Sequence, residues 1–485
     1  MLPRPPGCRG ATSKVTYMGE NPNRIEALFA EGNRLMAAGA ASRAEACFRE
    51  VITLEPDCAE AHTNLGLLLE QGGTLAEAER HYRYSLLLNP GSANTHLNLG
   101  VLLAGQKQFE EAEAAYLRAL AIAPGFSAAW SNLGVLQACR KQEKCAEQSY
   151  RKALEFDPDY RLAHFNLSYL LLRQGRFEEG WRCLEARNWY AQMEEDLPCP
   201  RWRGEPLAGL SLLITFEAGH GDMIQFCRYT GILKARGAAR ITLICHPALK
   251  TLFSGLAAVD ALFSFDEIVP LQNWDFWTPP LSMPLYCATR LDSIPAELPY
   301  LRAERDKVAR WESMLSGECL PSDVRVGVVW KGSANFENDA DRSLPGLGVL
   351  EPLGAVSGVR FFSLQKGAGE DEAAKPPAGL PLVNLGPLIE DFADSAAIVV
   401  NLDLVICVDT AVAHLSGALG KRCWVMLPDF KTDWRWLAGG ADSPWYPGVM
   451  RLFRQPRMGE WGTVVAEITE ALQILVPALS AATLP

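Results

Sequence analysis

Residues 91–124 read GSANTHLNLGVLLAGQKQFEEAEAAYLRALAIAP, and this stretch decides the fold of the N-terminal third of the chain. Its landmarks recur at a step of 34 residues. They are a glycine (Gly32, Gly66, Gly100, Gly134), an alanine (Ala44, Ala78, Ala112, Ala146), an aromatic ring (Phe48, Tyr82, Tyr116, Tyr150) and a proline (Pro22, Pro56, Pro90, Pro124, Pro158). Small residues let two helices approach, a ring fills the space opposite, and proline ends a helix because it lacks an N–H. Each unit is therefore predicted to be a helix pair, with the tyrosines buried between neighbouring units.

This period and pattern resemble the tetratricopeptide repeat. The resemblance implies an all-α solenoid of about five repeats over residues 21–192, after a disordered leader at residues 1–20. The fifth repeat is degenerate, because Ser168 replaces the glycine, Gly180 the alanine and Leu184 the ring. Such degeneration is typical of an end repeat that docks on another domain.

One asparagine position also repeats, in the first helix of each unit: Asn64, Asn98, Asn132 and Asn166. An amide can both donate to and accept from an extended peptide backbone. A ladder of these amides along the concave groove would bind a protein or peptide partner. The alternative is that asparagine simply fits this position of the repeat.

Composition excludes several classes of protein. The chain has 485 residues, 48% of them hydrophobic and 21% charged, which is typical of a globular protein with two or three domains. The net charge of −11 argues against a nucleic-acid partner. Thirteen cysteines without a Cys-x-x-Cys pair favour reduced thiols, and the seven histidines form no zinc motif. We saw no apolar run near the roughly 18 residues needed to cross a bilayer and no signal peptide, so we expect a cytoplasmic protein.

Beyond residue 192 the pattern changes to strands alternating with helices. A segment rich in proline, glycine and tryptophan at 193–209 is predicted to be a linker. Apolar strands are predicted at LSLLITF (210–216), ITLICH (241–246), VRVGVVW (324–330), GVRFFSL (358–364), LDLVICV (402–408) and RCWVMLP (422–428). Alternation of this kind predicts parallel sheets covered on both faces. We expect two Rossmann-like domains, at 210–320 and 321–478, with a ligand at the carboxyl ends of their strands.

The first strand runs into the glycine turn Glu217-Ala218-Gly219-His220-Gly221-Asp222. A dinucleotide fingerprint is disfavoured, because Ile224 stands where the third glycine would be and no acidic residue clearly ends the next strand. Asp222 at the start of a helix is either an N-terminal cap or a general base facing the cleft.

The sequence VDTAVAHLSGALG (408–420) predicts an anion site. A buried strand ends at Asp409-Thr410, and a helix of small residues begins at once. The free N–H groups of its first turn and the helix dipole suit a pyrophosphate. Structural capping by Asp409 and Thr410 is the alternative. A histidine in the position of His414, one turn into the helix, is more often a packing residue than a catalyst.

The blocks GHGDMIQFCRY, VGVVWKGS, FFSLQKG and ICVDTAVAHLSGALGK resemble, in this order, those of heptosyltransferase-like glycosyltransferases. The resemblance implies a GT-B pair of Rossmann-like domains, a nucleotide-sugar donor, inversion at the anomeric carbon and no metal or other cofactor. It also implies that Asp222 is the general base. The nucleotide sugar is expected at Gly221, Lys331, Arg342, Gln365, Asp409, Thr410, Ala411 and His414. Lys331 and Arg342 are alternative partners of the phosphates.

Some features depart from the family. The usual acceptor site is not recognisable, and His220 is an unusual insertion in the glycine turn. The segment 434–456 is rich in aromatic rings, of which Trp434, Trp436, Trp445 and Tyr446 either stack on a ligand or pack a domain interface. Two functions therefore remain open: a glycosyltransferase that acts on a protein or glycan, and a non-catalytic interaction scaffold.

Overall fold

The computed structural model describes residues 22–188, 190–269, 274–336 and 338–482, so the predicted leader lies outside the described residues. The chain forms two compact units, Met1–Leu170 and Leu171–Pro485. The division falls inside the first helix of the fifth repeat, and not at residue 192 where the repeat pattern ends.

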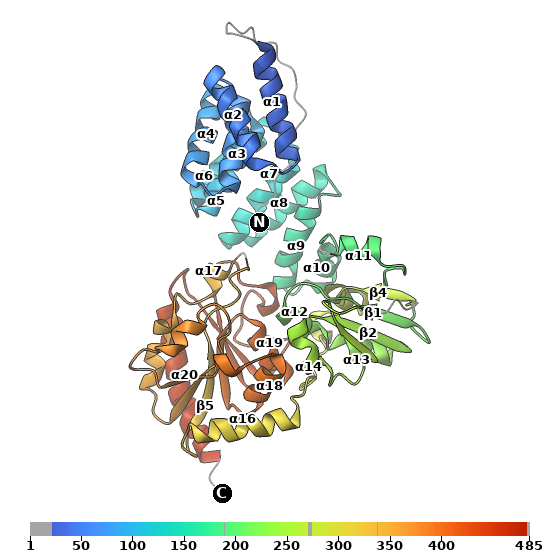
Figure 1. The fold of residues 1–485 in the computed structure, drawn as a ribbon, viewed down its shortest axis with the longest axis vertical. Helices are drawn as coiled ribbons and strands as arrows, with labels where there is room; N and C mark the ends of the chain where they lie inside the picture. The colour runs from blue at the N-terminus through green and yellow to red at the C-terminus, as the bar shows by residue number, and fades with distance from the viewer. Residues whose placement is uncertain (1–21, 189, 270–273, 337, 483–485) are drawn as a thin grey trace. The chain divides into compact units, whose positions relative to one another are not determined.

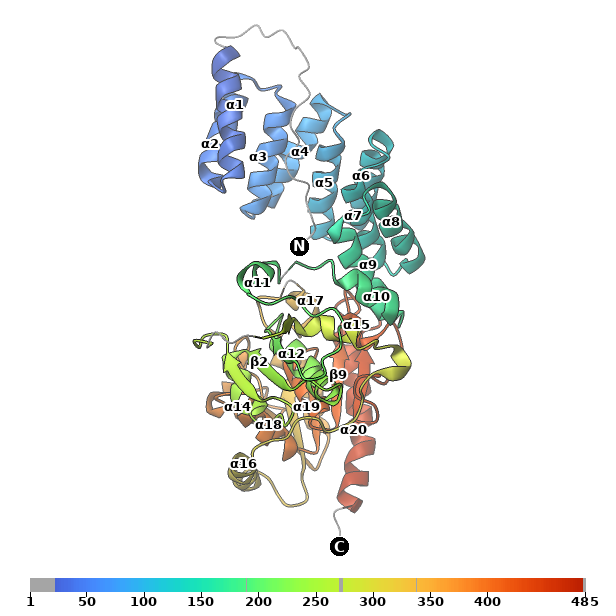
Figure 2. The same ribbon diagram turned by 90° about the vertical axis from the view of Figure 1, so that its right-hand side faces the viewer.

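The first unit consists of the predicted helix pairs (Figure 2). Its helices are α1 (Pro22–Ala37), α2 (Ala41–Leu54), α3 (Ala59–Gln71), α4 (Leu75–Leu88), α5 (Ala93–Gly105), α6 (Phe109–Ile122), α7 (Ser127–Cys139) and α8 (Glu143–Phe156), followed by the start of α9 (Arg161–Arg173). Tyr116 is fully buried, and a Cβ on Gly100 would lie 2.5 Å from its Cε1 atom. Tyr82 and Tyr150 are buried in the same way against Gly66 and Gly134. The predicted burial of the tyrosines is confirmed, and these contacts lie within one helix pair and not between neighbouring units.

The second unit contains a four-stranded parallel sheet of order β3-β2-β1-β4. The strands are β1 (Ser211–Ile214), β2 (Arg240–Cys245), β3 (Ala261–Ser264) and β4 (Phe276–Thr278). The helices of this part are α10 (Phe177–Leu184), α11 (Ala191–Asp196), α12 (His220–Phe226), α13 (Tyr229–Ala235), α14 (Lys250–Phe253) and α15 (Met283–Tyr286). Among these strands, β1 and β2 were predicted from the sequence.

A second parallel sheet has six strands in the order β10-β9-β8-β5-β6-β7. They are β5 (Val324–Val329), β6 (Val359–Ser363), β7 (Leu382–Asn384), β8 (Leu404–Val408), β9 (Cys423–Leu427) and β10 (Met450–Arg454). Its helices are α16 (Arg305–Gly317), α17 (Asp339–Arg342), α18 (Phe392–Val400), α19 (Ala411–Ala418) and α20 (Trp461–Ala482). Strands β7 and β10 were not predicted, and β10 lies within the aromatic-rich segment 434–456.

Two predicted boundaries differ from the observed packing. The segment predicted as a linker is docked on the first sheet, since Trp202 and Leu207 are buried and the Trp202 N–H donates to the Trp277 carbonyl at 2.7 Å. Helix α16 was assigned to the first Rossmann-like domain. It packs instead beside α18 of the second sheet, where the Trp311 indole donates to Asp394 at 3.2 Å.

Helix α20 is long and apolar enough, by length and composition, to cross a membrane: Trp461–Leu479 has a mean hydropathy of 1.4 and is 33% buried. No apolar run was predicted here, because Glu467 and Glu470 interrupt the apolar residues of this segment. Helix α20 lies beside the six-stranded sheet (Figure 1). Its Val464, Ile468 and Leu472 belong to the core of this sheet. That packing is typical of the core helix of a globular domain.

Candidate functional site

Asp222 lies in the first turn of α12, at the carboxyl end of β1, as predicted. Its Oδ2 atom accepts a hydrogen bond from the Gly219 N–H at 2.9 Å, which closes the glycine turn. The capping alternative is therefore correct for this oxygen. The second oxygen, Oδ1, is ion-paired with Arg435. Each carboxylate oxygen has two lone pairs, so both contacts leave acceptor capacity for a proton.

Arg435, the partner of Asp222, was not predicted from the sequence as a candidate site residue. It is 6% exposed and lies in the short helical turn Trp434–Trp436, 213 residues after Asp222. Its Nη1 donates to both oxygens of Asp433 at 3.0 and 3.1 Å, and its Nε donates to Gln225 at 2.6 Å. The fork geometry of a guanidinium allows this simultaneous pairing with two carboxylates. Arginines occur in the aromatic-rich segment 434–456, but the sequence does not reveal that Arg435 pairs with Asp222.

Asp409 and Thr410 follow β8 and precede α19, as predicted. The Thr410 side chain does not cap the helix. The Thr410 hydroxyl is buried and lies next to the Cys407 thiol. The first-turn N–H groups of α19 are thus not occupied by the threonine, in keeping with an anion site.

Burial raises the pKa of Asp409 to about 6. The neighbouring Asp433 carboxylate contributes to this increase, and the Arg342 guanidinium opposes it. Asp409 therefore carries only part of its charge when the pH is near 6. A protonated Asp409 would repel a diphosphate less than an ionised one.

The two helix starts are in direct contact (Figure 1). A Cβ on Gly221 would lie 2.9 Å from Cδ2 of His414 and 3.5 Å from the Ala411 Cα. The cleft that Asp222 was predicted to face, with a gap the size of a nucleotide sugar, is therefore closed at this point, and that prediction is wrong. Glycine is required at position 221 because the His414 ring occupies the space.

His414 is held by packing and by a hydrogen bond. Its Nδ1 is 2.9 Å from the Tyr446 hydroxyl, and its ring stacks on Trp436 with a centroid separation of 5.3 Å. Burial lowers the pKa of His414 well below its usual value, so the ring is neutral at physiological pH. These contacts favour the packing alternative for this residue.

The two candidate cations differ in their surroundings. The Lys331 ammonium is ion-paired with Glu372 at 2.7 Å. Arg342 pairs with Asp339 at 3.1 Å, its guanidinium lies over the Phe336 ring, and its charge acts on Asp409. Arg342 is therefore the cation that is coupled to the α19 start.

Gln365 has a structural role in this conformation. It is 1% exposed, and its Oε1 accepts from the N–H groups of Trp330 and Lys331 at 2.9 and 3.0 Å. Its Nε2 donates to the carbonyls of Lys331 and Ala368 at 3.1 and 2.9 Å. The side chain thereby fixes the loop that follows β5.

The aromatic residues of segment 434–456 pack in the interior. Trp434, Trp436, Trp445 and Tyr446 are each at most 1% exposed. Their alternative role as packing residues is therefore correct in this conformation.

A second group of rings lies beside the glycine turn. His220 packs 4.6 Å from His246 and 5.1 Å from Phe392, measured between ring centroids. Burial, with a smaller effect of His246, lowers the pKa of His220 to about 4. The histidine inserted before Gly221 is thus neutral at physiological pH.

The four asparagines of the predicted ladder are not all exposed to a peptide. Asn132 is fully buried and Asn98 is 7% exposed, whereas Asn64 and Asn166 are partly exposed. The Asn64 amide donates to Asn33 at 2.9 Å, and the Asn166 amide donates to Ser131 at 3.3 Å. Four open amides are therefore not presented together, and peptide binding at this position stays a prediction.

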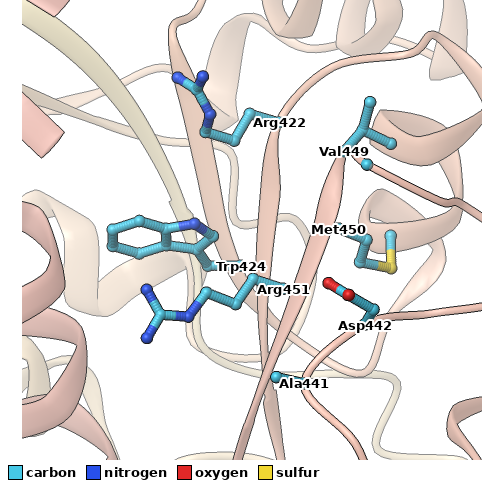
Figure 3. Close-up of a pocket in the computed structure, with 8 residues that line it drawn as sticks. Arg422, Trp424, Ala441, Asp442, Val449, Met450 and Arg451 are labelled. Carbon is cyan, nitrogen blue, oxygen red and sulfur yellow. The ribbon is translucent and has the colours of Figure 1, made fainter. Parts of the chain in front are cut away.

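A shallow pocket of about 290 Å³ lies elsewhere on the six-stranded sheet, near the amino ends of β9 and β10. Figure 3 shows Trp424 and Arg451 side by side in this pocket, with Arg422 and Asp442 nearby. Asp409 follows the carboxyl end of β8, so the pocket and the predicted donor site lie at opposite edges of a parallel sheet. Among the described residues, no three His, Cys, Asp or Glu side chains are grouped to hold a metal ion.

Comparison with known proteins supports the repeats directly. Tetratricopeptide repeat models match residues 29–93, 93–126 and 145–180. Protein FlbA of Caulobacter vibrioides is 28% identical over 326 residues, which cover 63% of this chain and 54% of that protein. The chain thus spans about half the length of this curated relative.

Two solved structures are similar to parts of the chain. YrrB, described as a TPR protein with an unusual peptide-binding site, is 18% identical, with a TM-score of 0.29; the match covers 37% of this chain and 95% of YrrB. A glycosyl transferase family 9 protein from Veillonella parvula is 11% identical, with a TM-score of 0.42; the match covers 56% of this chain and 99% of that protein. Within the chain itself, the helix pairs and the matching repeat models identify the N-terminal region as tetratricopeptide repeats.

Proposed function

We propose that the chain is an inverting glycosyltransferase that transfers a sugar from a nucleotide-sugar donor to a hydroxyl of a protein or glycan. The observation that carries the proposal is the contact between α12 and α19. Helix α12, with the Asp222 carboxylate in its first turn, packs on α19, whose start is not capped by the Thr410 side chain. These two features support a general base beside a diphosphate site. The resemblance of the sequence blocks to heptosyltransferase-like enzymes supports the same assignment.

In the proposed reaction, Asp222 accepts the proton of the acceptor hydroxyl. The hydroxyl oxygen attacks the anomeric carbon from the face opposite the diphosphate. The bond between that carbon and the diphosphate oxygen breaks, and the bonding electron pair leaves with the diphosphate. The first-turn N–H groups of α19 and the Arg342 guanidinium would stabilise the negative charge on the leaving group, which is commonly the largest catalytic contribution.

The base assignment is tested with Asp222→Asn and a matched control, Asp433→Asn. Both variants remove a carboxylate partner of Arg435, but in the proposal only Asp222 takes the proton. Asp222→Asn should reduce turnover by about 10²–10⁴-fold with little change in donor Kd, since this is the usual contribution of a general base. Equal losses in the two variants would assign the effect to Arg435 and would contradict the role of Asp222.

The donor site is tested with Ala411→Pro and with Arg342→Gln against Lys331→Gln. Proline at the first helical position removes one N–H without disturbing the helix, and Thr410 before it already has the extended backbone that proline requires. Ala411→Pro and Arg342→Gln should weaken the binding of nucleoside diphosphates in calorimetry, and Lys331→Gln should have the smaller effect. A wild-type chain that binds no nucleoside diphosphate or nucleotide sugar would refute the proposed activity.

A non-catalytic scaffold is the second candidate function. The direct packing of Gly221 against His414 favours it, because a donor has no open gap between the helix starts in this conformation. Absent transfer, with or without nucleotide binding, would support the scaffold, and transfer would exclude it.

A further inference from the structure

The Asp222–Arg435 pair joins two loops that come from different sheets. Asp222 belongs to the glycine turn after β1, and Arg435 belongs to the loop between β9 and β10. General-base catalysis depends on placing the carboxylate within a fraction of an ångström, so the elements that hold these loops matter for the proposed reaction. Both loops are held by the same element.

The glycine turn is fixed at its first residue, Glu217, which precedes Asp222 by five residues. Glu217 is 4% exposed and accepts two hydrogen bonds from Arg187, at 2.6 and 3.3 Å. A third bond comes from the Leu281 N–H at 3.1 Å. The start of the turn is therefore tied to the segment that follows α10.

Arg187 is itself fixed to the end of α10. Its Nη1 donates to the Leu184 carbonyl at 3.1 Å and to Glu185 at 2.8 Å, and its Nη2 donates to Ser282 at 2.7 Å. Arg201 is ion-paired with Glu185 and, at 3.4 Å, with Glu194, so the two buried arginines face three carboxylates. Each of the three side-chain nitrogens of Arg187 donates to at least one of these acceptors, which makes this arginine a rigid tether.

The Arg435 loop is held by aromatic side chains of α10. The Trp181 ring meets the Trp434 ring edge to face at 5.2 Å, and Phe177 stacks on Trp445 at 5.9 Å. The Arg435 guanidinium lies over that same Trp434 ring, 4.2 Å from its centroid. The backbone adds a hydrogen bond of 2.9 Å from the Ala438 N–H to the Arg173 carbonyl, just before α10.

We propose that α10 and the arginine that follows it are a positioning device for the proposed active site, and that Arg187 and Trp181 are its positioning residues. In sequence, α10 is the second helix of the fifth, degenerate repeat. One of its departures from the repeat pattern, Gly180, has a packing reason, because a Cβ at this position would lie 2.7 Å from the Leu172 side chain. This inference rests on the proposed transferase function for its kinetic consequences, but its structural part can be tested without turnover.

The structural part is tested by hydrogen–deuterium exchange of the full-length protein. Arg187→Met should increase the exchange of amides in the glycine turn (217–222), and Trp181→Leu should increase exchange in residues 433–438. Arg182→Gln is the matched control, because Arg182 lies on the same helix and pairs with Glu178 at the exposed surface. The control should leave both segments unchanged. Unchanged exchange in both segments of the two test variants would overturn the proposal.

The kinetic part of the test distinguishes a positioning role of Arg187 from a role in stability alone. Arg187→Met leaves Glu217 as a buried carboxylate without its cation, so the variant should also melt at a lower temperature. The double variant Arg187→Met/Glu217→Gln removes both charges and should recover most of the melting temperature. If Arg187 positions the turn, kcat of the double variant stays reduced by about 10-fold or more while the donor KM changes less than about threefold. Recovery of kcat together with stability would show a structural role only and would overturn the inference. If the wild type shows no transfer at all, the proposed function fails, and the exchange experiment alone decides the positioning role.

Discussion

At the scale of single residues, a repeated hydrogen bond fixes the turn between neighbouring repeats. His62, His96, Trp130 and His164 occupy the same repeat position, 34 residues apart. In each case a ring nitrogen lies 2.8–3.1 Å from the carbonyl of the proline six residues earlier. A carbonyl only accepts, so the histidines carry their proton on Nε2. The repeat position requires a ring N–H, which is why tryptophan can replace histidine there.

Asp409 provides a residue-scale prediction about pH. Its folded pKa of about 6 lies above its ordinary value of 3.8, so the folded protein binds the proton more tightly than the unfolded chain. The resulting stability is present below pH 4 and is lost as the pH rises through 6. Asp409→Asn removes this titration. Relative to wild type, the variant should gain up to about 3 kcal/mol in the free energy of unfolding between pH 4 and pH 7. Urea denaturation of both proteins at the two pH values measures this difference, and a pH-independent difference would contradict the raised pKa.

At the scale of elements, helix pairs of the solenoid depend on glycine for their close approach. Gly100→Leu should destabilise the first unit by about 1–3 kcal/mol, because any Cβ there collides with the Tyr116 ring. Gly105→Ala is the control, since it lies at the exposed end of the same helix with no atom within 4 Å of an added Cβ. The control should be neutral or stabilising by up to about 1 kcal/mol. Thermal unfolding followed by circular dichroism compares the two, and equal stability would contradict the packing of the pair.

Helix α20 yields a second prediction at this scale. Ile468 is fully buried in the core of the six-stranded sheet, whereas Ile474, on the same helix, is 76% exposed. Ile468→Ala should cost about 2–5 kcal/mol, because it leaves a cavity in the core. Ile474→Ala should change stability by less than about 0.5 kcal/mol, as is usual at the surface. Similar effects in urea denaturation would show that α20 does not pack on the sheet by this face.

At the scale of the whole molecule, the two compact units are expected to divide the proposed function. A chain that begins at Arg161 lacks the first four repeats but keeps α10 and both sheets. It should bind nucleotide sugar with the Kd of the full chain and lose transfer to a protein acceptor, because the repeats are proposed to recruit that acceptor. Calorimetry and a transfer assay measure the two properties. Undiminished transfer to the protein acceptor would assign its recognition to the second unit.

The sequence by itself determined the solenoid and the positions of Asp222, Asp409 and Thr410 at the carboxyl ends of strands. Helix pairing is encoded locally, since each glycine meets a ring only 16 residues further along the chain. Apolar strands followed at once by helices likewise place their end residues at one edge of a parallel sheet.

The tertiary structure alone decided which side chains meet at the site. Arg435 reaches Asp222 across 213 residues, and Arg187 reaches Glu217 across 30. Such pairs carry no periodic signal, because an ion pair depends on the direction of two side chains and not on their spacing in the chain. The same reason explains why the burial of Asn98 and Asn132 was not evident: a repeat position fixes the side of a helix, but the neighbouring helix determines how much of that side remains open.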